Sequence, residues 1–188
     1  MSATRELKRH RLSVEDYHKM GQAGILSDAD RVELIGGELV DMAPIGSEHA
    51  GIVYLLNRLL TEMLGEKAII GAQNPIVLGN HSEPQPDILV LHPREDFYRN
   101  SHPTSGDVFL LIEVTDTTTN QDRKLKLPLY AQHNVPEVWL IDIPNRSVEL
   151  YRKPHPPTRT YNHIEILREG TARATHLDAL EIDLDLIF

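Results

Sequence analysis

The chain has 188 residues, of which 40% are hydrophobic and 25% charged, and its formal net charge is −9. This composition is enough to bury one ordinary core, so it excludes a mainly disordered chain, and the absence of Cys excludes disulfides, thiolate metal sites and a cysteine nucleophile. Apolar runs are too short for a membrane span, and no signal-peptide stretch follows the basic N-terminus, so the expected location is the cytoplasm.

The first part of the chain predicts a short helix, a β-hairpin and a long helix. Residues 13–16 (Ser-Val-Glu-Asp) have the spacing of a capping box, which predicts a helix start. Two apolar runs within residues 31–42 flank Gly36-Gly37, and this pattern predicts two antiparallel strands joined by a tight turn. Between residues 49 and 64 apolar positions recur at three- and four-residue spacing, which indicates a helix with one buried face.

The rest of the chain predicts a sheet and one further helix. Strands are expected at residues 68–71, 75–78, 87–92, 108–115, 138–142 and 147–151. The runs at 88–91 and 108–112 do not alternate with polar residues, so both faces of these strands should be covered and the strands should be central. A helix is expected from about residue 122 to residue 133, with Pro128 as a kink or a late first turn.

One globular domain with two appendages is expected. Residues 1–12 should form a flexible basic arm, residues 13–153 the domain itself, and residues 154–188 a C-terminal extension packed on the same domain.

Two acids stand at the ends of runs that should be buried. Asp87 precedes the run 88–91, and Glu113 follows the run 108–112. An unpaired buried carboxylate is costly, so each acid needs a cation, hydrogen bonds or a raised pKa, and a shared metal ion would serve both. The alternative is that each acid caps its strand in solvent, and the spacing alone does not decide between the two.

The helix after Glu113 carries Asp122, Lys126 and Tyr130 at four-residue spacing, on one face. In one interpretation Lys126 lies beside the two carboxylates, where its charge would orient a water and stabilise a pentavalent phosphorane. In the other, Asp122 and Lys126 form an exposed ion pair of little energetic value. Lys124 is the second candidate for the cationic role.

The ordered set of motifs resembles a known family. Its blocks are the hairpin Val32-Glu-Leu-Ile-Gly-Gly-Glu-Leu, His49 at a helix start, Pro75-Ile-Val-Leu, Pro86-Asp87, Glu113-Val114, Asp122 through Lys126 with Tyr130, and Pro136-Glu-Val-Trp-Leu-Ile-Asp142. Pro86-Asp87 followed by Glu113 resembles the PD-(D/E)xK nuclease superfamily. The whole set, from about residue 12 to residue 153, resembles more closely the Uma-type family of proposed restriction endonucleases.

The resemblance implies an α/β restriction-endonuclease-like fold, in which helices flank a central mixed β-sheet with an N-terminal β-hairpin. It also implies a catalytic Mg²⁺ or Mn²⁺ ion held by Asp87 and Glu113, and hydrolysis of phosphodiester bonds in DNA. The superfamily places a lysine two residues after the second acid, where this chain has Thr115; in the resembling family the lysine comes from the following helix, which matches Lys126 as the third catalytic residue. The candidate accessory site residues are Glu33, His49, Asp122 and Tyr130.

Other chemistries lack their motifs. The sequence contains no G-x-x-x-x-G-K, G-x-G-x-x-G, H-E-x-x-H or G-x-S-x-G pattern, so nucleotide-binding, zincin and serine-hydrolase interpretations have no support. Its 10 histidines are scattered, and their spacing does not predict a zinc site.

Charge leaves the partner open. A net charge of −9 does not favour nucleic-acid binding, but the N-terminal arm is basic, and Arg123 and Lys124 beside Lys126 are candidate nucleic-acid-binding residues. No membrane partner is expected, and a homodimer would be the simplest way to cut both DNA strands. The alternative function is a catalytically inactive nucleic-acid- or protein-binding module on the same fold, motivated by Thr115 and the acidic balance; a hydrolase of another phosphoester is a third.

Overall fold

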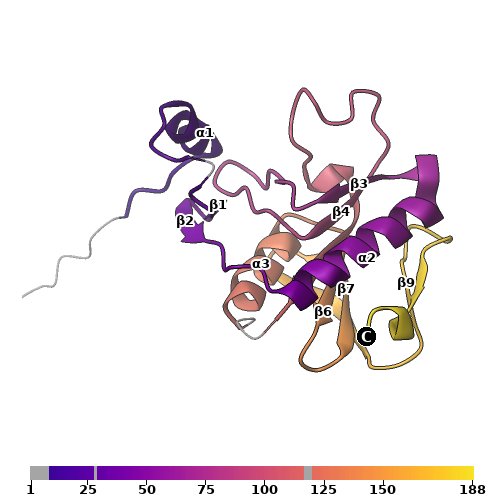
Figure 1. Cartoon of the computed structure of the whole chain (residues 1–188). Helices are drawn as coiled ribbons and strands as arrows, with labels where there is room; N and C mark the ends of the chain where they lie inside the picture. The colour runs from indigo at the N-terminus through magenta and orange to yellow at the C-terminus, as the bar shows by residue number, and fades with distance from the viewer. Residues whose placement is uncertain (1–8, 28, 117–119) are drawn as a thin grey trace, which may run out of the picture.

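A six-stranded mixed sheet forms the centre of the protein (Figure 1). The computed structural model describes residues 9–27, 29–116 and 120–188, and in the last range it describes side chains from residue 123 onward. The strands, in spatial order, are β3 (Ile69–Ala72), β4 (Ile88–Leu91), β5 (Val108–Thr115), β6 (Glu137–Asp142), β7 (Ser147–His155) and β8 (Thr160–Leu167). Neighbouring strands are antiparallel except β5 and β6, which are parallel. The central mixed sheet predicted from the sequence is confirmed.

Helices cover both faces of this sheet. Helix α2 (Ser47–Leu64) packs on the face that carries Ile88, and α3 (Asn120–Gln132) packs on the face that carries Leu89. Because successive residues of β4 enter the two different cores, its apolar run is not interrupted by polar residues. Helix α3, with Pro128 inside it, also connects β5 to β6, and this crossover allows the two strands to be parallel.

The N-terminal part carries a helix and a hairpin outside the main sheet. Helix α1 (Val14–Gln22) begins with the predicted capping box, in which Ser13 and Asp16 bond each other's backbone N–H. Strands β1 (Val32–Ile35) and β2 (Glu38–Asp41) form a two-stranded sheet of their own, as predicted.

The hairpin turn depends on its two glycines. Gly36 and Gly37 have φ angles of 60° and 84°, which only glycine adopts at little cost. A Cβ atom on Gly37 would also lie 2.6 Å from Cβ of Arg11, so the preceding segment packs directly on this turn.

The C-terminal residues complete the core on the side of α2. Strands β9 (Thr171–Arg173) and β10 (Glu181–Asp183) form a small antiparallel sheet. Its neighbourhood contributes buried residues to the same core as α2, namely Ala172, Leu177, Leu180, Ile182, Leu184 and Ile187. Strand β7 continues through Lys153 and Pro154 into the hairpin with β8, so the chain on both sides of residue 153 shares one sheet. The remaining short elements are the 3-10 helices η1 (Gly65–Lys67), η2 (Ser105–Asp107) and η3 (Leu184–Leu186).

One predicted strand is wrong. Ile76 and Leu78 are buried, but residues 75–78 make only an isolated bridge, at Val77. The reason lies in their partners, since the N–H groups of Ile76 and Val77 donate to the carbonyls of Pro84 and Pro103. A proline has no N–H group, so Pro84 and Pro103 cannot donate a second hydrogen bond back to this segment, and a regular strand pairing cannot form.

Among the described residues, no helix combines the length and apolar character needed to cross a bilayer.

Candidate active site

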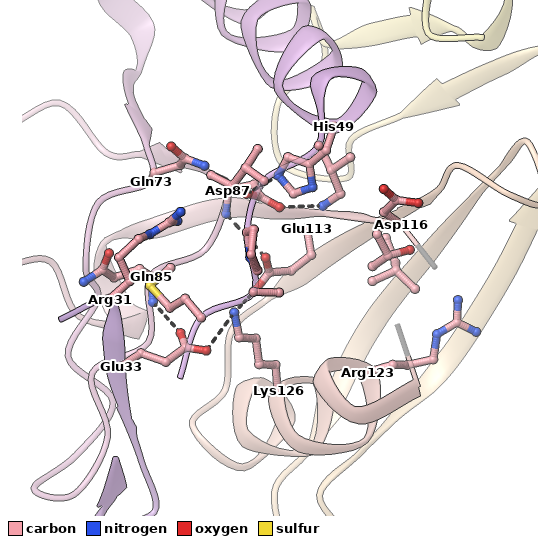
Figure 2. A pocket seen from close by; sticks show the side chains of 18 of the residues that line it. Arg31, Glu33, His49, Gln73, Gln85, Asp87, Glu113, Asp116, Arg123 and Lys126 are labelled. Atoms are coloured by element: carbon pink, nitrogen blue, oxygen red, sulfur yellow. Dashed lines mark hydrogen bonds and ion pairs between the residues drawn. The ribbon is translucent and has the colours of Figure 1, made fainter. Parts of the chain in front are cut away.

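Asp87 and Glu113 lie side by side where two strands of the sheet meet (Figure 2). Ile88 of β4 pairs with Ile112 of β5, which brings Asp87, one residue before β4, next to Glu113. The backbone N–H of Val114 donates to Oδ2 of Asp87 at 2.9 Å, and the backbone N–H of Asp87 donates to Oε2 of Glu113 at 3.4 Å. Both carboxylates are buried, so neither is the solvent-exposed strand cap of the alternative interpretation.

His49 fixes the other oxygen of Asp87. It projects from the first turn of α2, and its Nε2 lies 2.9 Å from Oδ1 of Asp87. The hydrogen bond to Asp87 raises the pKa of His49, the negative charges of Asp87, Glu113 and Asp116 add to the rise, and burial opposes it. Both oxygens of Asp87 therefore have defined partners before any ligand binds.

Lys126 and Tyr130 approach Glu113 from the opposite face of the sheet. They lie one turn apart on α3, and the Tyr130 hydroxyl donates to Oε1 of Glu113 at 2.5 Å. Nζ of Lys126 lies 3.6 Å from the same oxygen. Lys126 is buried, so it is not the exposed cation of the alternative interpretation.

Glu33 brings the N-terminal hairpin into the site. Its Oε1 lies 3.2 Å from Nζ of Lys126, and its Oε2 accepts the backbone N–H of Gln85 at 3.0 Å. Figure 2 shows Glu33 entering from β1, on the far side of Lys126 from α3. Lys126 is therefore held between two carboxylates that come from different sheets.

The electrostatics of the site are dominated by burial. The pKa of Glu113 is raised to about 7: burial is the main cause and the charges of Asp87 and Glu33 add to it, whereas Lys126 and the Tyr130 hydroxyl oppose the rise. Burial and the adjacent Glu113 likewise raise the pKa of Tyr130 well above its ordinary value. The Tyr130 hydroxyl therefore stays protonated and able to donate to Glu113.

The donor chemistry of this site fits a divalent cation. Asp87, Glu113 and Glu33 supply more negative charge than Lys126 alone neutralises, and the charges of Asp87 and Glu33 add to the effect of burial in raising the pKa of Glu113. Mg²⁺ and Mn²⁺ prefer carboxylate oxygens as protein ligands. Asp87 and Glu113, adjacent and buried, present such oxygens.

Thr115 occupies the position where the superfamily pattern has lysine. It lies two residues after Glu113 on β5 and lines the same pocket. Its hydroxyl donates to the backbone carbonyl of Ile141 at 3.1 Å, so it serves the junction between β5 and β6. Lys126 brings an ammonium to Glu113 from α3 instead.

Arg123 and Lys124, two of the other predicted residues, lie on the same helix as Lys126. Nη2 of Arg123 lies 3.0 Å from Oδ2 of Asp142 and 3.1 Å from Oε1 of Glu149, so its charge is engaged within the protein. Lys124 is exposed on α3. Asp122 belongs to α3, but its side chain lies outside the described residues, as do the basic arm's residues 1–8.

A pocket of about 210 Å³ opens onto these groups. It is also lined by residues that the sequence did not single out: Arg31, Asp41, Gln73, Gln85 and Asp116. A period of two along extended chain would have indicated two of them, because Arg31 precedes Glu33, and Gln85 precedes Asp87, by two residues. Gln73 reaches the site through the backbone, since its N–H donates to the carbonyl of Asp87 at 3.0 Å.

The fold and the paired carboxylates define a protein of the restriction-endonuclease-like class. The sequence profile of the Uma2 family, described as "Putative restriction endonuclease", matches residues 14–186. The chain therefore belongs to the Uma2 family, which confirms the predicted resemblance. The crystal structure of a "putative nuclease belonging to DUF820" from Anabaena variabilis has the same fold, with a TM-score of 0.72 and 19% sequence identity over 94% of this chain and 97% of that chain. No curated protein matches the sequence.

Proposed function

We propose that this protein is a divalent-metal-dependent endonuclease that hydrolyses phosphodiester bonds in DNA. The observation that carries the proposal is the convergence of Asp87, Glu113 and Lys126 on one pocket, in a chain of a restriction endonuclease family. Two acids that can hold a metal ion, with an adjacent ammonium to stabilise negative charge, are groups that can catalyse phosphodiester hydrolysis at neutral pH.

Asp87 and Glu113 would hold the ion, Mg²⁺ or Mn²⁺. When bound, the ion lowers the pKa of a coordinated water and offsets the charge of the scissile phosphate. The protein's part is to keep both carboxylates aimed into the pocket. Asp87 is oriented by the backbone N–H of Val114 and by the imidazole of His49. Glu113 is oriented by the Tyr130 hydroxyl.

Lys126 supplies the positive charge that the transition state needs. Its ammonium is buried and held in place by Glu33 and Glu113, so its position is fixed before substrate arrives. As water attacks phosphorus, negative charge builds up on the phosphoryl oxygens, and a preorganised ammonium stabilises that charge at little cost in reorganisation. Glu33 acts as a positioning residue for Lys126.

DNA must approach the pocket of a chain whose net charge is −9. Exposed cations at the rim of the site therefore matter for affinity. Arg31 lines the pocket, and Lys124 is exposed on α3 beside it; both can contact phosphates outside the catalytic centre. Cleavage of both strands is simplest with two such sites, which a homodimer would supply.

The test is cleavage of plasmid and single-stranded DNA by the wild type, Asp87→Asn and Glu113→Gln, with Mg²⁺, Mn²⁺ or EDTA. Exposed Glu66→Gln on η1 is the matched control. We expect metal-dependent cutting by the wild type and the control only, with all four proteins folded by circular dichroism. Cutting by either acid variant, or cutting in EDTA, would overturn the proposal; DNA binding that is indifferent to EDTA and without cleavage would favour the inactive binding module.

A further inference from the structure

A second cluster of metal-ligating side chains lies outside the proposed active site. His18 of α1, Glu83 and His102 come from three segments far apart in sequence, and one ligand atom from each lies within 4.8 Å of the other two. Nε2 of His18 lies 2.8 Å from Oε2 of Glu83. The rings of His18 and His102 have centroids 6.0 Å apart at an interplanar angle of 66°.

The donor set differs in kind from that of the active site. Two imidazole nitrogens with one carboxylate are typical ligands of Zn²⁺ and similar transition-metal ions, and three protein ligands leave coordination positions for water. Mg²⁺, by contrast, prefers oxygen ligands throughout. The two sites should therefore select different ions.

Glu83 gives the cluster a buried anion. Its side chain is only 5% exposed, whereas that of His18 is 41% exposed. A buried carboxylate needs a cationic partner or full hydrogen bonding. A divalent ion bound by neutral imidazoles would provide that positive charge.

The segments that carry the ligands are anchored. The backbone N–H of Glu83 donates to the carbonyl of Leu34 at 2.7 Å, which fixes Glu83 against β1. The residue after His102, Pro103, accepts the N–H of Val77 at 2.9 Å. Preorganised ligands lose little conformational entropy when they bind an ion.

An ion has a route to the cluster. His18 and His102 line a surface hollow of about 350 Å³, together with Tyr17 and Asp30. Both imidazoles are accessible from this hollow, whereas Glu83 is buried and is not among the residues that line it.

We propose that His18, Glu83 and His102 bind a Zn²⁺-type transition-metal ion, and that this ion ties α1 and the segment of His102 to the chain that leads into Asp87. Glu83 stands four residues before Asp87 and pairs with Leu34, the neighbour of Glu33. The ion would therefore brace two of the three segments that supply acids to the active site, those of Glu33 and Asp87, without contacting substrate.

The test uses the tag-free full-length protein, stripped with EDTA, dialysed and titrated with Zn²⁺ by calorimetry and with Co²⁺ by absorption spectroscopy. The variants are His18→Gln, His102→Gln and their double variant, with exposed His163→Gln as the matched control. A fifth variant, Asp87→Asn with Glu113→Gln, removes the active-site acids.

We expect one Zn²⁺ per chain and a rise in melting temperature on zinc addition in the wild type, the control and the Asp87/Glu113 variant. Each single histidine variant should bind Zn²⁺ about tenfold or more weakly, and the double variant should lose the Co²⁺ visible bands. Unchanged zinc affinity in the double variant would overturn the proposal, as would loss of the site in the Asp87/Glu113 variant. The experiment measures zinc binding and not cleavage, so a protein without nuclease activity would not contradict the proposed zinc site.

Discussion

Nζ of Lys126 lies 3.6 Å from Oε1 of Glu113, although the two residues belong to different elements, a helix and a strand. A lysine two residues after the acid would reach it along the same strand. Here α3 brings Lys126 to the acid, with Tyr130 one turn later bound to the same oxygen. Position 115 on β5 therefore need not carry the lysine, and the Thr115 hydroxyl there donates to the backbone of β6.

Loss of the Lys126 charge should remove rate and leave metal binding. Lys126→Met keeps the aliphatic stem but removes the ammonium, so cleavage should fall about 10²-fold or more while Mn²⁺ affinity changes little. The measurements are plasmid cleavage and Mn²⁺ titration, with Lys67→Met on η1 as an exposed control. Wild-type cleavage by Lys126→Met would remove Lys126 from the catalytic centre.

A lysine restored to the strand should partly rescue that variant. Positions 113 and 115 both face the pocket, so the double variant Thr115→Lys, Lys126→Met places an ammonium two residues from Glu113. We expect it to cleave about tenfold or more faster than Lys126→Met alone, since the same preorganised charge is regained. Thr115→Lys on the wild-type background reports the cost of the substitution itself. If the double variant has the same melting temperature as Lys126→Met but cleaves no faster, a lysine at position 115 cannot replace the lysine at position 126.

The buried charge of Glu113 should make the metal-free protein less stable as pH rises. Its pKa is about 7 when folded against an ordinary 4.5, so the folded state binds the extra proton between these values. Stability from this group is present below about pH 4.5 and is lost as pH rises through about 7. The side chain of Glu113→Gln stays neutral at every pH. The free energy of unfolding of this variant, relative to that of the wild type, should therefore rise by ~1–3 kcal/mol from pH 5 to pH 8. Urea unfolding in EDTA at several pH values measures this gap, and a gap that does not change with pH would contradict the assignment.

His49 should act on Asp87 through its hydrogen bond. His49→Ala removes the partner of Oδ1 and should weaken Mn²⁺ binding ~10-fold or more, whereas His49→Gln can still donate an N–H and should lose less. Calorimetric Mn²⁺ titration of both variants separates the cases. Equal losses in the two would mean that His49 does more than orient the carboxylate.

The hairpin turn should tolerate substitution at one glycine far better than at the other. Both have positive φ, but a Cβ at Gly36 meets no atom within 4 Å, whereas at Gly37 it would lie 2.6 Å from Cβ of Arg11. Gly36→Ala should cost about 1 kcal/mol, and Gly37→Ala should cost more because the chain around Arg11 must move. Thermal melts of the two variants give the comparison, and equal melting temperatures would show that the packing of Arg11 on the turn is unimportant.

The sequence predicts most of this fold because local patterns specify most of its elements. The capping box at Ser13, the glycine turn and the helical periodicity of α2 each have a short-range physical cause, and each is confirmed. Residues 75–78 have the apolar content of a strand, but the N–H groups of Ile76 and Val77 donate to the carbonyls of Pro84 and Pro103, and no local pattern reveals these partners.

The centre of the site is predictable for a different reason. The order of Asp87, Glu113 and Lys126 resembles a family, and the structure brings these three together. The engagement of Arg123 by Asp142 and Glu149, and the cluster of His18, Glu83 and His102, depend on tertiary contacts between segments without any spacing relation. Such contacts follow only from the assembled chain.

The β1–β2 hairpin forms a sheet of its own yet supplies Glu33 to the site. Its described attachments include Glu33 to Lys126, Glu33 to the backbone of Gln85, and Leu34 to Glu83, and within the described part of the chain no strand ladder joins it to the main sheet. A local opening can therefore release the hairpin while the six-stranded sheet stays folded. The activity would then depend on the equilibrium between the docked and the released hairpin. In a denaturant titration, DNA cleavage should disappear before the circular dichroism of the sheet changes.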